Sequence, residues 1–205
     1  ANKNAHRTLN FEATKRLFEA CQEAEVSKFI FISTVSVYGA FSSKKPISIH
    51  TQTSPVTPYS IAKLDTEKFL LGSNNSTAIS VIRLPLVYGD NAPGNYGVLE
   101  RLAKSRLPLP FLNTRNKRSI VSVELVAKII KNAAQSKEKY LGLHLLAEIR
   151  PYSTKEIIER IKTKNRFSPM LFPVPLFLMR IVLTVIGKGQ MYEQLYEDLE
   201  FVSTI

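Results

Sequence analysis

The sequence predicts an α/β fold: a doubly wound parallel sheet followed by a smaller, mixed α/β subdomain. Two apolar runs, at residues 29–33 (FIFIS) and 78–84 (AISVIRL), have the β-branched and aromatic content of strands buried on both faces. A helical pattern at 57–71 lies between them, and this order of strand, helix and strand indicates parallel neighbours. In a chain of 205 residues, 44% apolar and 22% charged side chains are typical of a globular protein.

The first half of the chain carries the elements of the sheet. Residues 10–24 predict a first helix. The apolar side chains near one of its faces are Phe11, Leu17, Ala20, Cys21 and Ala24. Residues 40–57 are rich in Ser, Thr and Pro and predict a surface loop. The next helix begins at Thr57-Pro58, a favourable N-cap followed by proline at the first helical position, and ends at Gly72.

A turn-rich segment (DNAPGNYG, residues 90–97) indicates a boundary between two partly interleaved domains, residues 1–90 and 91–205. Beyond it, the pattern predicts helices at 96–106, 123–135 and 154–163 and a strand at 141–147. The helix at 154–163 follows Ser153 and includes Glu156, which have the spacing of a capping box.

Residues 175–186 predict a helix that is apolar on all sides except at Arg180 and Thr184. We expect this helix to be buried or to form a subunit contact, and contact with a membrane surface is the less favoured alternative. The longest uncharged apolar run, residues 167–179, contains three prolines and is shorter than the roughly 18 residues of a membrane span. We therefore predict no transmembrane helix.

The charge balance, 28 basic against 17 acidic side chains, gives +11 and favours an anionic partner. No RNA-binding or zinc-finger signature is present, so we predict no nucleic-acid partner. The single cysteine, Cys21, excludes a disulfide framework and suits a reducing compartment, hence an expected cytoplasmic location. His6, His50 and His144 are too far apart in the sequence to suggest a metal site.

Three side chains have the chemistry needed to oxidise or reduce an alcohol. Thr34 follows a predicted strand, and ligands collect at the carboxyl ends of the strands in an open parallel sheet. Tyr59 and Lys63, four residues apart on the next helix, point in the same direction. A neighbouring ammonium favours the phenolate, which takes a proton from a hydroxyl. Tyr-x-x-x-Lys alone occurs by chance in many helices, so the prediction rests on the combination with Thr34.

The sequence resembles the extended short-chain dehydrogenase/reductase family of nucleotide-sugar enzymes. The motifs that carry the resemblance are FISTVSVYG (31–39), Tyr59 at 25 residues after Thr34, NFEATKRLFEA (10–20) and RLPLVYG (83–89). The likeness continues through residues 91–97, 107–111, 116–126 and 173–175. Within the family, these later segments look most like UDP-hexose and UDP-N-acetylhexosamine 4-epimerases and 4-ketoreductases.

The resemblance implies a Rossmann-like fold and a role for each matching residue. Tyr59 is implied as the acid/base, Thr34 as the hydrogen-bond partner of the reacting sugar oxygen, and Lys63 as a ligand of the nicotinamide ribose. The cofactor is implied to be NAD or NADP. The residues implied to form its binding site are Asn10, Ser33, Tyr59, Lys63 and Pro85. The residues implied on the substrate side are Ser36, Asn95, Leu109, Phe111 and Arg118.

Among the substrate residues, Arg118 would bind the UDP diphosphate, for which a guanidinium fork is suited. Asn95 would also reach the diphosphate, and Leu109 and Phe111 would flank the uracil. Each has a structural alternative: a solvated basic face for Arg118, a turn for Asn95, and the core for the two apolar residues. Ser33 and Ser36 have the alternative of simple strand-end and turn hydroxyls.

These implied roles predict an NAD(P)-dependent UDP-sugar enzyme, a UDP-glucose or UDP-N-acetylglucosamine 4-epimerase. The alternatives are a UDP-4-keto-sugar reductase and a catalytically inactive nucleotide-sugar-binding relative. Val35 and Ser36 stand where dehydratases of the family carry an Asp-Glu pair, which disfavours dehydration. The resemblance also implies a homodimer that pairs the helices at 10–24 and 57–71.

The glycine-rich turn with which the family begins is not in this sequence. Gly94 and Gly97 follow the Val-Tyr-Gly segment and lack the third glycine. The chain also starts at Ala1 rather than Met. We therefore expect the first β-α-β portion to be absent from this chain, and the 205 residues alone to bind cofactor weakly and to turn over little substrate.

Overall fold

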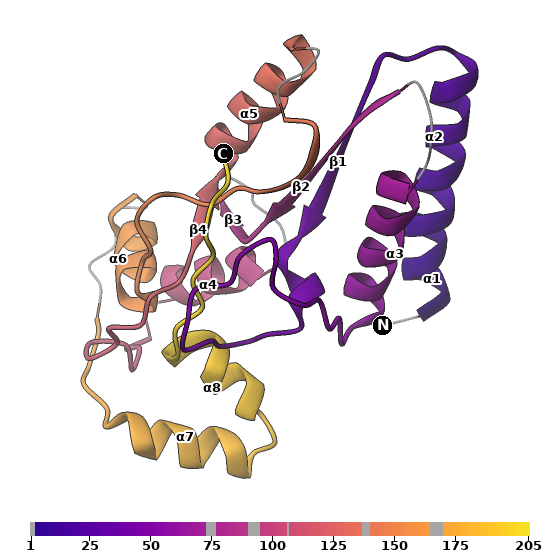
Figure 1. The fold of residues 1–205 in the computed structure, drawn as a ribbon. Helices are drawn as coiled ribbons and strands as arrows, with labels where there is room; N and C mark the ends of the chain where they lie inside the picture. Colours follow the sequence, from indigo (N-terminus) through magenta and orange to yellow (C-terminus); the bar gives the residue numbers. More distant parts are fainter. Residues whose placement is uncertain (1–2, 73–76, 90–94, 106, 137–139, 165–169) are drawn as a thin grey trace.

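Three parallel strands form the sheet of the computed structural model (Figure 1). They are β1 (Lys28–Thr34), β2 (Ala78–Leu84) and β5 (Gly142–Leu145), in the order β1-β2-β5. The structure describes residues 3–72, 77–89, 95–105, 107–136, 140–164 and 170–205. Both strands predicted in the first half are present, and the predicted strand at 141–147 is present in a shorter form. The predicted α/β fold with a parallel sheet is confirmed.

Helices cover both faces of this sheet. On one face, α2 (Ala13–Glu23) and α3 (Pro58–Gly72) enclose a core formed by Phe18, Phe31, Leu70 and Val81. On the other face, α5 (Val123–Gln135) packs its apolar side against residues of β1 and β2. Phe29 and Phe31 of β1 face one core and Ile30 and Ile32 the other, which explains why residues 29–32 are all apolar.

The first helix is longer than predicted. It begins with α1 (Lys3–Arg7), continues through a π turn, η1 (Thr8–Glu12), and ends with α2. The side chain that α2 buries is Phe18, whose ring packs edge-on against Phe29 and Phe69, with centroids 5.2 and 6.0 Å away. Leu17, predicted on the apolar face, is instead 58% exposed.

Both predicted helix starts are confirmed by their hydrogen bonds. At α3, the Ser60 backbone N–H donates to Thr57 Oγ1 and the Thr57 N–H donates to Ser60 Oγ, each at 3.1 Å. At α6 (Thr154–Lys164), the Glu156 N–H donates to Ser153 Oγ at 3.1 Å, and the Ser153 N–H donates to the Glu156 carboxylate at 2.8 Å. These reciprocal bonds fix where each helix begins.

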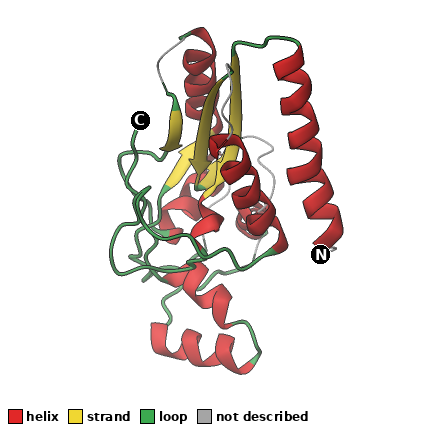
Figure 2. Ribbon diagram, turned by 45° about the vertical axis from the view of Figure 1, so that its right-hand side comes forward, coloured by secondary structure: helices red, strands yellow, loops and turns green. Residues whose placement is uncertain are grey.

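The second half builds a separate core beside the sheet (Figures 1 and 2). It contains α4 (Asn95–Lys104) and α6, with a short parallel ladder of β3 (Leu86–Tyr88) and β4 (Ile120–Ser122). This ladder, the 3-10 turn η2 (Val35–Tyr38) and α8 (Gly189–Tyr196) were not predicted. Strands of three residues are too short to show a period-two pattern.

The apolar helix predicted at 175–186 is present as α7 (Leu176–Val185). The expectation that the chain itself buries this helix is wrong. One side packs toward α8 and places Met179 and Leu183 against the second core, whereas Phe177 and Val185 are 64% and 80% exposed. In the part of the chain that the structure describes, no helix is long and apolar enough to cross a membrane.

Candidate active site

A cavity of about 570 Å³ opens at the carboxyl edge of the sheet. The parallel register pairs Thr34 of β1 with Leu84 of β2, so Thr34 and Pro85 lie at the same edge. The second core closes the cavity from the other side through residues of α4, α6 and α8. The predicted site residues that line this cavity are Thr34, Ser36, Tyr59, Pro85 and Arg118.

Tyr59 and Lys63 lie on the same side of α3, as their spacing predicts. The Lys63 Nζ lies 5.9 Å from the centroid of the Tyr59 ring and 4.5 Å from that of Phe31. It donates a hydrogen bond of 2.9 Å to the Ile32 carbonyl oxygen of β1. The ammonium therefore sits behind the phenol, against the end of the strand, while the phenol itself reaches the cavity.

Burial controls the ionisation of this pair. Burial raises the pKa of the Tyr59 phenol above its usual value of 10, and burial lowers the pKa of the Lys63 ammonium although the nearby Glu67 carboxylate raises it. The predicted lowering of the Tyr59 pKa by the ammonium is wrong, because burial acts on the phenol in the opposite direction. At neutral pH the phenol is protonated and is a proton donor.

The turn η2, which directly follows Thr34, fixes the Thr34 hydroxyl at the cavity. The Thr34 Oγ1 accepts a hydrogen bond from the Ser36 N–H and donates one to Ser36 Oγ, both at 3.1 Å. Thr34 is thus the N-cap of η2, and this bond fixes its hydroxyl at the strand end. Both hydroxyls border the cavity beside Tyr59.

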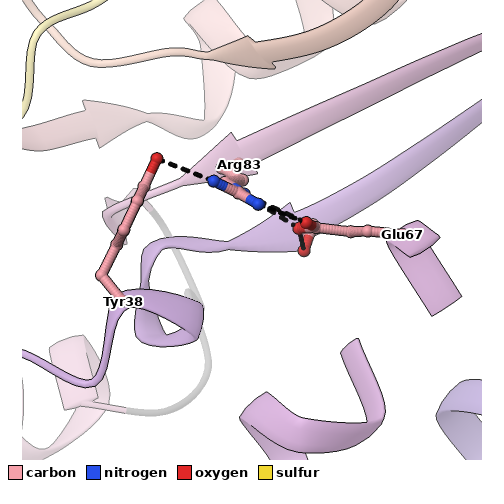
Figure 3. A network of polar contacts seen from close by, with 4 residues as sticks. Tyr38, Glu67 and Arg83 are labelled. Atoms are coloured by element: carbon pink, nitrogen blue, oxygen red, sulfur yellow. Dashed lines mark hydrogen bonds and ion pairs between the residues drawn. The ribbon is translucent and has the colours of Figure 1, made fainter. Parts of the chain in front are cut away.

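Figure 3 shows a buried polar network of Tyr38, Glu67 and Arg83, and Ser33 joins this network instead of bordering the cavity. Its hydroxyl donates to the Glu67 carboxylate. Arg83 binds the same carboxylate, with Nη2 2.6 Å from Oε2, and donates from Nη1 to the Tyr38 hydroxyl at 2.8 Å. The Arg83 and Glu67 side chains are only 5% and 2% exposed, so each charge depends on the other.

Sequence reasoning missed Glu67 and Arg83, although both left a signal. Glu67 follows Lys63 by four residues and so shares its side of α3. Arg83 is a charge inside an otherwise apolar strand, and a buried charge requires a partner. The network joins α3, β1 and β2 directly behind the residues that border the cavity.

Asn10 lies in the π turn η1, beside the middle of α3. Its side-chain Nδ2 donates to the His6 carbonyl at 3.1 Å, and its own carbonyl accepts from Thr66 Oγ1 at 2.8 Å. His6 in turn packs edge-on against Tyr59, with ring centroids 6.0 Å apart. Asn10 does not line the cavity but braces the helix that carries Tyr59, as is common for π turns near functional sites.

Arg118 borders the opposite side of the cavity. Its Nη1 donates to the backbone carbonyls of Phe41, Glu193 and Glu197 at 3.3, 3.2 and 3.1 Å. Burial lowers the pKa of its guanidinium to about 10. The side chain is a half-buried cation beside a cavity rather than part of a solvated basic face.

The remaining predicted substrate residues lie elsewhere. Leu109 and Phe111 are 6% and 3% exposed in the second core, where Phe111 stacks on Tyr196 with centroids 5.4 Å apart. Neither borders the cavity, so a role at the uracil stays a prediction. Asn95 is the first residue of α4, next to residues 90–94, and its side chain lies outside the described part of the structure.

Comparison with known proteins agrees with this geometry. A model of the NAD-dependent epimerase/dehydratase family matches residues 2–142. The chain belongs to this family. The dependence of this family on NAD agrees with the cofactor that the sequence predicts.

Among curated relatives, a UDP-glucose 4-epimerase of Vibrio cholerae is 27% identical over 199 residues, covering 95% of this chain and 61% of the relative. A Bacillus subtilis protein described as an uncharacterized UDP-glucose epimerase is 40% identical over 82 residues, covering 39% of this chain and 25% of that protein. The chain therefore spans less than two thirds of the length of these relatives.

Solved structures of the family share the fold. The UDP-glucose 4-epimerase of Thermotoga maritima, solved with UDP-glucose, aligns with a TM-score of 0.71 and 20% identity, over 99% of this chain and 63% of that structure. The UDP-glucuronic acid 4-epimerase of Bacillus cereus, solved with NAD, aligns with a TM-score of 0.69 and 19% identity, over 96% and 59%. At these identities the likeness establishes the Rossmann-like fold.

Proposed function

We propose that the protein containing this chain interconverts the C4 epimers of UDP-glucose or UDP-N-acetylglucosamine with NAD. The observation that carries the proposal is a single cavity bordered by Thr34 and Tyr59 at the sheet edge and by Arg118 on the far side. A proton-transfer group and a half-buried guanidinium suit a sugar joined to a diphosphate. The curated relatives named as UDP-glucose epimerases support the same reaction.

Each residue has a defined task in this reaction. Tyr59 transfers the proton of the sugar 4-hydroxyl. The phenolate, a minor form at neutral pH because burial raises the pKa of Tyr59, accepts that proton, and the phenol returns it when the 4-keto sugar is reduced. Thr34 Oγ1 hydrogen-bonds the same oxygen and orients it. When bound, NAD would supply the hydride chemistry at sugar C4, removal of the hydride and its return. Rotation of the 4-keto sugar between these two steps inverts C4.

The residues behind Tyr59 suit the nicotinamide end of NAD. Lys63 uses one N–H donor on the Ile32 carbonyl, and its other donors match the paired hydroxyls of a ribose. Pro85 borders the cavity at the end of β2, where it offers an apolar wall. Ser33 donates to Glu67, so we assign it to support of the strand end rather than to direct contact with the cofactor.

Arg118 is assigned to the diphosphate. Replacing it with lysine keeps the charge but removes the planar fork, so UDP affinity should fall about 10- to 100-fold, as for loss of one charged hydrogen bond. Titration calorimetry of the full-length protein with UDP measures this change. Lys117→Arg, next to it in the sequence and outside the cavity, is the matched control. Unchanged affinity in Arg118→Lys would assign the diphosphate to another site.

The alternative is a 4-keto-sugar reductase, since Thr34, Tyr59 and Lys63 serve both reactions. The full-length protein is incubated with UDP-glucose or UDP-N-acetylglucosamine and no added reductant. We expect the C4 epimer to form with no net change in NADH. Strict dependence on NADPH would instead support the reductase, and binding of the nucleotide sugar without turnover would support an inactive relative.

We also propose a homodimer through α2 and α3 and a cytoplasmic location. Exposed apolar side chains on these helices support the dimer: Leu17 and Leu71 are 58% and 42% exposed. Light scattering of the full-length protein measures the mass, and a monomer would refute the dimer. The single cysteine supports a reducing compartment.

A further inference from the structure

The outer face of α7 is a continuous apolar surface. Phe177, Ile181 and Val185 recur every four residues and form one stripe, with exposed fractions of 64%, 55% and 80%. Leu178 and Val182 widen the stripe and are 44% and 52% exposed. The helix thus turns its larger apolar face outward. An exposed apolar patch of this kind marks an interaction site in a soluble domain.

The sequence around this face is basic. α7 and the turn that follows it contain Arg180 and Lys188 and no Asp or Glu. Arg180 lies on α7 itself, with its guanidinium 5.9 Å from the Tyr192 ring centroid, and Lys188 is exposed in the turn that follows. The apolar stripe is therefore flanked by cations that favour an anionic partner.

The position of α7 suits contact with a flat surface. In both ribbon views α7 lies at the extremity of the molecule, on the far side of α8 from the sheet (Figures 1 and 2). The opposite side of α7 packs within the molecule, because Met179 and Leu183 contact the second core. A planar partner can therefore reach the outer stripe without displacing the rest of the molecule.

A second copy of the chain fits this face less well. Two copies meeting on α7 would place two Arg180 and two Lys188 side chains in one interface, because a two-fold contact uses the same surface of both copies. Within α7 and the turn that follows it, no Asp or Glu would offset the repulsion among these four cations. A lipid surface with negative headgroups satisfies the cations and accepts the apolar stripe together.

We propose that α7 attaches the protein peripherally to membranes that contain anionic lipids. Phe177, Ile181 and Val185 enter the boundary between headgroups and acyl chains, about 5–10 Å deep for helices of this type. Arg180 and Lys188 contact the negative headgroups. The attachment is independent of the catalytic assignment, because α7 contributes no residue to the cavity.

Vesicle flotation of the full-length protein tests this proposal. We expect the protein to float with vesicles of equal parts phosphatidylglycerol and phosphatidylcholine, and to float less with phosphatidylcholine alone or at high salt. Ile181→Ser with Val185→Ser should lower the partition coefficient roughly 10- to 100-fold, because two aliphatic side chains no longer enter the bilayer. Leu141→Ser with Ile149→Ser, which removes exposed apolar side chains elsewhere, should float like the parent protein.

Thermal melting and epimerase assays in solution show whether the variants remain folded. Absence of the parent protein from the floated fraction would overturn the proposal. Equal flotation of the Ile181/Val185 variant would also overturn it. A parent dimer that dissociates in that variant and does not float would assign the face to a second copy instead.

Discussion

Replacing Tyr59 with phenylalanine is expected to lower kcat for C4 epimerisation about 10²- to 10⁴-fold, the range for loss of a general acid/base. The phenol borders the cavity beside Thr34, and the substitution removes only its hydroxyl. Binding of UDP-sugar should persist, since Arg118 and the cavity walls are unchanged. Turnover is measured by separating the epimers, and binding by calorimetry with the full-length protein.

The pH profile gives a second readout of the same residue. Because burial raises the pKa of Tyr59, the phenolate fraction grows as pH increases from neutral to alkaline values. Wherever removal of the 4-hydroxyl proton limits the rate, kcat/KM should therefore rise with pH, and Tyr59→Phe should lose that rise. Tyr88→Phe removes a phenol that bonds Glu148 outside the cavity and is the matched control. Equal turnover by Tyr59→Phe and the parent would exclude Tyr59 as the acid/base.

Replacing Glu67 with glutamine is expected to lower the free energy of unfolding by about 3–5 kcal/mol. The Arg83 Nη2 lies 2.6 Å from Glu67 Oε2, and both side chains are nearly inaccessible to water. The neutral amide leaves the Arg83 charge buried without its counter-ion. Denaturant unfolding of the full-length protein, followed by circular dichroism, measures the change.

A double variant separates the ion pair from general damage to the core. Arg83→Met should be as destabilising as Glu67→Gln because it strands the opposite charge. Combining Glu67→Gln with Arg83→Met removes both charges, and its loss of stability should be smaller than the sum of the two single changes. Additive losses in this cycle would show that Glu67 and Arg83 do not depend on each other.

The sheet and most helices could be predicted from the sequence because their signals are local. The strand at 78–84 is apolar except at Ser80 and Arg83, and the start of the helix at 57–71 is predicted by Thr57-Pro58. By contrast, β3 and β4 are three residues each and exist only as partners of each other. No local pattern could predict them.

The site was predictable in part for the same reason. Tyr59 and Lys63 share one side of a helix by spacing alone, and Thr34 follows from the end of a strand. The orientation of Ser33 toward Glu67 depends on how α3 packs against β1, which its own sequence does not reveal. The exposure of the outer face of α7 was also not predictable, because a helix with apolar residues on all sides has the same sequence pattern whether the core covers it or it contacts an external surface.

The most direct test of the proposed chemistry is epimerisation in D₂O, followed by proton NMR at sugar C4. The full-length protein is given UDP-glucose or UDP-N-acetylglucosamine with NAD and no reductant. If the hydrogen on C4 leaves as hydride and returns to the same carbon while Tyr59 moves only the hydroxyl proton, the epimer carries no deuterium at C4. Deuterium at C4, or no epimer at all, would contradict the account.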